Sequence, residues 1–129
     1  TQLAAAVYGY LVDHISYDQP KADTVQSGYL PDPDETLAAG KGICFDYAAL
    51  AAAMLRSQGV PTRLITGYVA PDGIYHAWNQ IYIRDGGWIT VEIRANPGQW
   101  QRVDITFAAG GMPAGEIQND SEYTTRFTY

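Results

Sequence analysis

The sequence predicts an α+β fold, with helices in the N-terminal half packed on an antiparallel β-sheet built from the C-terminal half. Up to Ser57 the chain shows helix-type spacing and alanine-rich runs, whereas from Thr62 it alternates β-branched and aromatic residues with turn signals. Because helices and strands are segregated along the chain, a helix layer on one face of a sheet is the expected arrangement. The 129 residues and 47% hydrophobic composition suit one domain over residues 1–129, and the absence of an initial Met suggests that it is excised from a longer protein.

The first helix is expected over residues 2–14, where apolar residues recur on one helix face, at Leu3, Val7, Tyr10 and Leu11. Residues 18–34 contain three prolines and a glycine, which predicts an irregular connection. A cap at Asp34 or Thr36 should follow, and then one short helical turn over residues 36–39.

A second, central helix is expected from Cys44 to Ser57. Glycines at 40 and 42 precede it, and its alanine-rich and leucine-bearing sequence has high helix propensity. Gly59 and Pro61 should end it.

The second half reads as strands separated by short turns. Strands are expected over residues 62–69, 74–83, 88–94 and 100–107, with turns at 71–73, 85–87 and 96–98. Residues 108–122 read as a loop and residues 123–129 as a last edge strand. The central helix should therefore pack on the sheet that carries His76.

The charge and apolar patterning exclude several classes of partner. A net charge of −6 and a pI near 4.6 argue against binding to nucleic acid or to an anionic membrane surface. The longest apolar run, residues 48–55, is too short to span a bilayer. The single cysteine excludes an internal disulfide and does not identify a compartment.

Three residue types in this chain are the components of a thiol enzyme. Cys44 lies at the start of the central helix, where unpaired backbone N–H groups favour negative charge on sulfur. A thiol needs a base to take its proton, and the base needs a third group to orient it. His76 and Asp104 can supply these functions if the fold brings the three positions together.

Each of these residues also has a purely structural interpretation. Cys44 could be a small buried apolar residue, His76 a hydrogen-bonded strand histidine beside Trp78, and Asp104 a strand-end aspartate with a local hydrogen bond.

Two further polar groups fit a functional role less well. His14 stands at the end of the first helix in a polar setting. The acidic group Asp32, Asp34 and Glu35 lacks metal-ligand spacing and reads as a helix-capping loop, so we expect no metal and no cofactor.

Five blocks surround the three residues in order, at residues 40–48, 56–63, 67–68, 76–79 and 103–107. Together they resemble the core of the bacterial transglutaminase-like superfamily over residues 37–109. The resemblance implies a papain-like fold with the cysteine at the start of a central helix and the histidine and aspartate on neighbouring strands. It also implies that Cys44 is the nucleophile, His76 the base and Asp104 the orienting acid.

The orienting acid has a second candidate. Many relatives carry the aspartate on the strand directly after the histidine strand, where this chain has Glu92. We prefer Asp104, because the sequence Val-Asp-Ile-Thr-Phe at residues 103–107 keeps the Asp-x-Thr spacing of the family.

The resemblance implies a thiol acyl-transfer enzyme that attacks a carboxamide or peptide bond of a protein or peptide, outside the cell or in its envelope. Transfer of the acyl group to water would make it a cysteine protease or amidase, and transfer to an amine would make it a transglutaminase. The backbone N–H of Cys44 is the expected oxyanion donor, with Tyr17 as a candidate for the second.

Other functions remain open from the sequence. A cell-wall peptidase or an arylamine acetyltransferase would use the same residue types. A non-catalytic module that binds peptide or cell wall is supported by the 10 Tyr and 3 Trp, which could line a groove.

Overall fold

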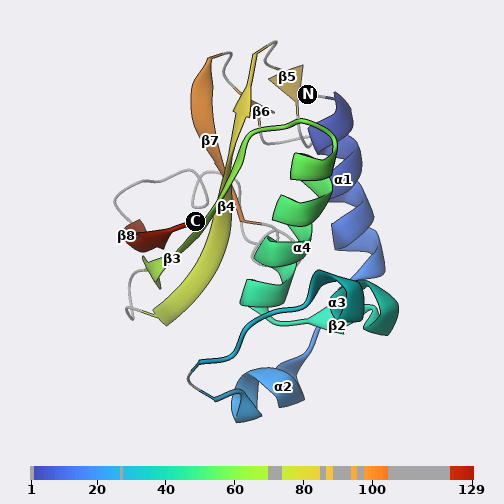
Figure 1. The fold of residues 1–129 in the computed structure, drawn as a ribbon, viewed down its shortest axis with the longest axis vertical. Helices are drawn as coiled ribbons and strands as arrows, with labels where there is room; N and C mark the ends of the chain where they lie inside the picture. The colour runs from blue at the N-terminus through green and yellow to red at the C-terminus, as the bar shows by residue number, and fades with distance from the viewer. Residues whose placement is uncertain are drawn as a thin grey trace.

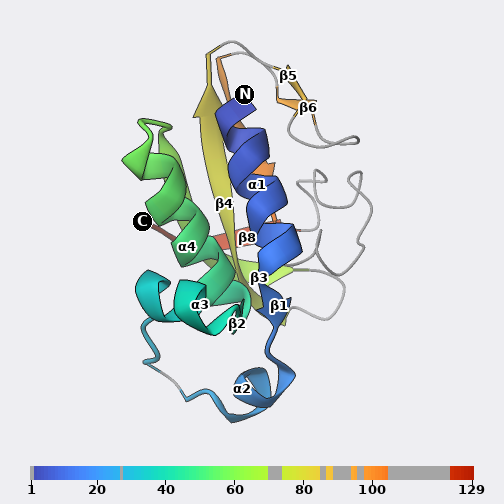
Figure 2. The same cartoon turned by 90° about the vertical axis from the view of Figure 1, so that its right-hand side faces the viewer.

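A computed structural model describes residues 2–26, 28–69, 74–84, 87–88, 94–95, 98–104 and 123–129. Two long helices, α1 (Gln2–His14) and α4 (Cys44–Ser57), lie side by side against one face of a β-sheet (Figures 1 and 2). Their bounds confirm the two helices predicted from the sequence. Within the described ranges, no helix is both long enough and apolar enough to pass through a bilayer.

In the described ranges, the main sheet has four antiparallel strands in the order β7-β4-β3-β8 (Figure 1). These strands are β3 (Thr62–Val69), β4 (Ile74–Ile83), β7 (Gln99–Val103) and β8 (Tyr123–Thr128). The bounds of β3 and β4 agree with the sequence prediction, and β8 is an edge strand as expected. The α+β fold class is therefore confirmed.

Among the described residues, three apolar clusters hold the layers together. The largest lies between α1, α4 and the sheet and includes Leu11, Tyr47 and Ile81. A second consists of Ala48, Ala49, Leu64 and Ala77. Because most of its members are small, α4 approaches the sheet closely near its Cys44 end. The third cluster consists of Ile65, Val69, Trp78 and Tyr123.

The connection predicted to be irregular contains a short helix, α2 (Gln19–Thr24), which the sequence analysis missed. The next helix, α3 (Pro33–Ala39), also begins earlier than expected, with Asp32 and not Asp34 or Thr36 as its N-cap. Both errors have the same physical cause. Each helix has a proline in its first turn. Backbone N–H groups in the first turn make no hydrogen bond within the helix, so proline, which lacks an N–H, is tolerated there and does not break the helix.

Two dipeptide strands, β1 (Ser16–Tyr17) and β2 (Lys41–Gly42), form a parallel pair that was not predicted. Gly40 precedes β2 with a φ of 70°, a left-handed conformation that glycine adopts without steric cost. This pair brings Tyr17 next to the segment that leads into Cys44.

One predicted strand is wrong. Residues 88–94 were expected to form a single strand, but β5 (Gly87–Trp88) pairs antiparallel with β6 (Arg94–Ala95), so the ends of that run face each other. Alternation of side-chain types indicates an extended backbone, but it does not determine which strand that backbone pairs with. The strand predicted over 100–107 is observed as β7, one residue earlier, up to Val103. The predicted loop 108–122 and Glu92 lie outside the described residues.

Candidate active site

Cys44 is the first residue of α4, and its side chain is half-buried at the edge of a cleft. Ile43 is the N-cap, and its carbonyl accepts the first hydrogen bond of the helix, from the Tyr47 N–H. The N–H groups of the first helical turn have no partner within the helix and point toward its N-terminal end. The sulfur therefore lies where a negative charge is favoured, and it is open to the cleft and not sealed in the interior.

Asp46 fixes this helix start to the segment in front of it. Its carboxylate is fully buried and accepts hydrogen bonds from the Ile43 N–H at 2.9 Å, from Lys21 Nζ at 2.8 Å and from the Tyr29 hydroxyl. Burial lowers the pKa of Lys21, but the hydrogen bonds and charges of Asp46 and Tyr29 outweigh it and raise the pKa. Lys21 thus stays charged, and the 19–30 segment is held to the first turn of α4.

His76 lies on β4, and the side chain of Asn79 joins that strand to its neighbours. The Asn79 amide donates to the Ala48 carbonyl of α4 at 3.0 Å and to the Arg63 carbonyl of β3 at 3.2 Å. Buried amides of this kind must be satisfied, so the register between helix and strand is well defined. This contact places the histidine strand against the cysteine helix.

Asp104 follows β7 and is fully buried next to His76. The His76 Nε2 lies 2.8 Å from Asp104 Oδ2, and because a carboxylate only accepts, Nε2–H is the donor. The Tyr123 hydroxyl donates to the same oxygen at 2.9 Å. Strands β7, β4 and β8 therefore converge on one carboxylate.

Asp104 occupies Nε2 of His76, and the Cys44 side chain lines the same cleft as His76 and acts on the pKa of its ring. Burial lowers the pKa of His76. The hydrogen bonds and negative charges of Asp104 and Cys44 outweigh this effect and raise the pKa to about 9. At neutral pH the ring is protonated, and an imidazolium stabilises a thiolate beside it.

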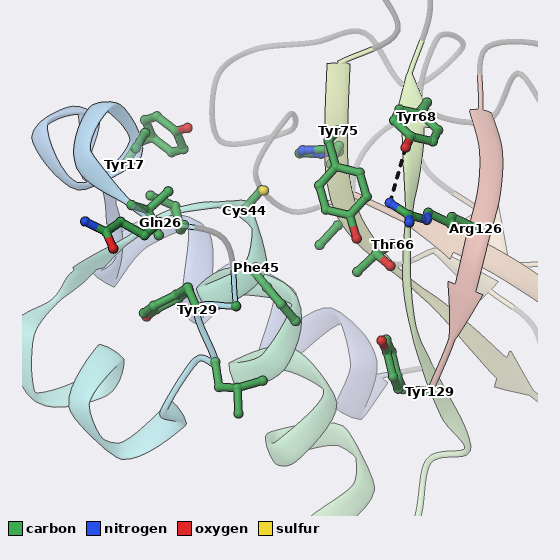
Figure 3. A pocket seen from close by; sticks show the side chains of 17 residues that line it. Tyr17, Gln26, Tyr29, Cys44, Phe45, Thr66, Tyr68, Tyr75, Arg126 and Tyr129 are labelled. Atoms are coloured by element: carbon green, nitrogen blue, oxygen red, sulfur yellow. Dashed lines mark hydrogen bonds between the residues drawn. The ribbon is translucent and has the colours of Figure 1, made fainter.

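The cleft in front of Cys44 has a volume of about 670 Å³. One wall carries Tyr17, Gln26 and Tyr29, and the other carries Tyr68, Tyr75 and Arg126 (Figure 3). Cys44 lies between them, and His76 is also among the lining residues. This volume is within the range of about 300–1,000 Å³ that is usual for ligand pockets in proteins.

The structure brings Cys44, His76 and Asp104 together and places Tyr17 in the same cleft, whereas His14 and Asp32 have other contacts. The His14 ring stacks on Tyr10 with 4.1 Å between centroids, and its Nδ1 bonds the Tyr10 carbonyl at the end of α1. Asp32 caps α3 as the acidic loop was expected to do. No group of three potential metal ligands occurs in the part of the chain that the structure describes.

Sequence reasoning missed Tyr123 and Asp46. Tyr123 was placed on the edge strand without a role, because 18 residues with no recognised motif separate it from Asp104. Asp46 could have been noticed as an acidic residue at the third position of a helix, where it accepts from the N-cap N–H.

Comparisons with solved structures support the papain-like, transglutaminase-core fold. A candidate cysteine protease from Cytophaga hutchinsonii is 19% identical with a TM-score of 0.64, over 98% of this chain and 35% of that chain. Calcium-bound LapG of Legionella pneumophila is 16% identical with a TM-score of 0.67, over 99% of this chain and 64% of that one. A TGase is 20% identical with a TM-score of 0.61, over 94% and 29% of the two chains.

Sequence comparison gives a partial relative and a family. An uncharacterized protein of Mycobacterium leprae is 38% identical over a stretch that covers 37% of this chain and 20% of that protein. The chain thus spans less than two thirds of the length of each of these relatives. The model of the transglutaminase-like superfamily matches residues 1–105. The chain therefore belongs to the transglutaminase-like superfamily.

Proposed function

We propose that this domain is a thiol acyl-transfer enzyme that attacks a carboxamide or peptide bond of a protein or peptide. Cys44 is its nucleophile, His76 its acid and base, and Asp104 its orienting acid. The observation that supports this most is that the half-buried Cys44 thiol and His76 line the same large cleft, where His76 is hydrogen-bonded to the buried carboxylate of Asp104. A strand histidine with a purely structural role needs neither the thiol nor the cleft.

The proposed reaction begins with the thiolate–imidazolium pair. The Cys44 sulfur bonds to the substrate carbonyl carbon, and the carbonyl electron pair moves onto oxygen. When the oxyanion collapses, the C–N bond breaks and His76 Nδ1–H gives its proton to the leaving amine, which leaves an acyl thioester. His76 then takes a proton from water or from a second amine as that group displaces the sulfur. Asp104 holds the ring orientation throughout and remains ionised.

The oxyanion would lie at the N-terminus of α4, near the Cys44 N–H, and Tyr17 is the proposed second donor. Tyr17 lines the cleft opposite Tyr75 (Figure 3). Burial, followed by the negative charges of Cys44 and Asp23, raises the pKa of Tyr17, so its hydroxyl remains a neutral donor. Tyr17→Phe is expected to lower kcat on the order of 100-fold while the reaction of Cys44 with small alkylating agents is retained.

The thiol itself gives the most direct test. The rate of iodoacetamide reaction with Cys44 should stay high well below pH 8, and His76→Gln should lower it toward that of free cysteine. His14→Gln is the matched control, because it removes the other imidazole, which is exposed at the C-terminal end of α1 and bonded to the Tyr10 carbonyl. Asp104→Asn should lower turnover about 100-fold or more, because the amide no longer fixes the tautomer of His76.

The acyl acceptor is tested by incubating the protein with casein and a labelled primary amine, followed by mass spectrometry. Incorporation of the amine indicates transamidation, and new peptide termini indicate hydrolysis. A thiol that reacts no faster than free cysteine at any pH would contradict the enzyme, and would favour a peptide-binding module that uses the tyrosines of the cleft.

A further inference from the structure

The wall of the cleft opposite Tyr17 carries an unusual arginine. In the pairing of β3 with β8, Thr66 lies opposite Phe127 and Gly67 lies opposite Thr125, so Arg126 is skipped. Such a bulge redirects the side chain of the extra residue. Arg126 lines the cleft, and its Nη1 lies 3.4 Å from the Tyr68 hydroxyl (Figure 3).

Thr66 gives a second, independent observation on the same wall. It is 1% exposed, and its hydroxyl has no hydrogen-bond partner among the described residues. A buried hydroxyl without a partner costs about 1–3 kcal/mol, so such groups are rare unless something else satisfies them. Thr66 lines the cleft, and Figure 3 shows its hydroxyl on the same wall as Arg126 and Tyr68. We refer to Thr66, Tyr68 and Arg126 as the Arg126 subsite.

The charge around this subsite is one-sided. In the part of the chain that is described, Arg126 contacts the Tyr68 hydroxyl and the Phe127 ring, and it forms no ion pair. Among the described residues that line the cleft there is no Asp or Glu, although the chain has a net charge of −6. Asp23 acts on the opposite wall, next to Tyr17. A guanidinium and a free hydroxyl on one wall together complement a carboxylate, which accepts from both.

We propose that the Arg126 subsite binds a carboxylate of the substrate, so that the enzyme selects peptides with an Asp or Glu side chain close to the attacked carboxamide. This inference rests on the proposed function, because it names the substrate class of the same cleft. Arg126 is a specificity residue and takes no part in the transfer of protons. It lies beyond residues 1–105, which the family model matches, so the family resemblance does not supply this preference.

The test uses alkylating peptides, because they report on the cleft without a known substrate. Iodoacetyl peptides with zero, one or two glycines before an amidated Asp are compared with the same peptides carrying amidated Asn. At the best spacing, the second-order rate of Cys44 alkylation should be roughly two- to fivefold higher for Asp, as expected for a partly exposed ion pair. The preference should weaken as salt is raised. A peptide ending in Asn with a free carboxylate distinguishes a C-terminal carboxylate from an acidic side chain.

Substitutions test whether the preference for Asp depends on the Arg126 subsite. Arg126→Gln should abolish it, and Arg126→Glu should reverse it in favour of a Lys peptide. Arg84→Gln is the matched control, because it removes the same charge beyond the far end of β4 and should leave the preference unchanged. Thr66→Val should reduce the preference without loss of stability, since the methyl group replaces a hydroxyl that has no partner among the described residues.

Several outcomes would overturn the proposed carboxylate subsite. Equal rates for Asp and Asn at all spacings, a preference that survives Arg126→Gln, or a loss that is the same in Arg84→Gln would overturn the carboxylate subsite. Faster reaction only with the free C-terminal carboxylate would also overturn it. A thiol that is unreactive toward every probe at pH 6 would instead contradict the proposed enzyme, so the two failures are distinguishable.

Discussion

His76 is hydrogen-bonded to the buried carboxylate of Asp104, and the half-buried thiol of Cys44 lines the same cleft and acts on its pKa. The two partners outweigh the burial of the ring and raise its pKa to about 9. A raised pKa means that the imidazolium is present below that pH and is lost as the pH rises through it. The proton that the proposed reaction gives to the leaving amine is therefore available across the neutral range.

The protonation state of His76 can be observed directly. The chain has two histidines, so its imidazole NMR spectrum contains two ring signals to follow against pH, and His76→Gln assigns them. We expect the His76 signal to titrate near pH 9, and turnover to fall over the same interval, because leaving-group protonation is lost. A titration midpoint of the His76 signal at or below pH 6.5 would contradict the hydrogen-bonded ion pair between His76 and Asp104.

Tyr123 should affect the pKa of His76 through its hydrogen bond to Asp104. Its hydroxyl donates to Asp104 Oδ2, the same oxygen that accepts from His76. Tyr123→Phe removes that donor and leaves more of the carboxylate charge to stabilise the imidazolium. We expect the pKa of His76 to rise by roughly 0.5 to 1 pH unit, equivalent to one neutral hydrogen bond. The ring signals measure it, with Tyr82→Phe as a control on the opposite half of β4, and an unchanged pKa would mean that Tyr123 only packs.

At the residue scale, the sequence marks the three residues of the proposed site better than the residues that contact them. Cys44 is marked by its place before an alanine-rich helix, and His76 and Asp104 by short motifs. Tyr123 and Arg126 carry no local signal, because their roles depend on which strand pairs with β3 and on where that pairing is irregular. Such information is tertiary, and local sequence patterns do not contain it.

At the scale of elements, long periodic segments were predictable and short ones were not. The bounds of α1, α4, β3 and β4 follow from side-chain spacing and from glycine and proline at their ends. The short helix α2 and the β1–β2 pair are too brief to show a period. They are held by a cap at Asp18 and by hydrogen bonds to residues distant in sequence.

Gly67 determines how closely β8 approaches β3. A Cβ at this position would lie 2.0 Å from the Thr124 carbonyl oxygen and 2.8 Å from the Trp78 ring. Gly67→Ala should therefore displace β8, lower the free energy of unfolding by about 1–3 kcal/mol and remove the Asp preference of the alkylating peptides. Gly9→Ala on α1 is the control, since a Cβ there meets nothing within 4 Å and should stabilise the helix by up to about 1 kcal/mol. If Gly67→Ala and Gly9→Ala are equally stable in urea unfolding, a Cβ at position 67 does not clash with β8 or Trp78.

At the scale of the whole molecule, the largest core lies away from the reacting groups. Leu11 is 0% exposed and packs between α1, α4 and the sheet, whereas Cys44 lies at the N-terminal end of α4. The fold thus separates the residues that stabilise it from those proposed to react.

Leu11→Ala tests this separation. The cavity should lower the free energy of unfolding by about 2–5 kcal/mol, measured by urea denaturation. The alkylation rate of Cys44 in the folded fraction should stay unchanged. Leu37→Ala, at a position that is 45% exposed, should change stability by no more than about 0.5 kcal/mol. A slower thiol in folded Leu11→Ala would show that the core and the site are coupled.

The position of β8 at the rim of the sheet has an evolutionary consequence. Its hydrogen-bonding partner is β3 on one side, and most of its residues after Tyr123 are exposed, so replacements there disturb few neighbours. The proposed substrate preference can then diverge among descendants while the three proposed catalytic residues are inherited intact. The same property makes this strand the natural place to graft altered selectivity by directed mutagenesis.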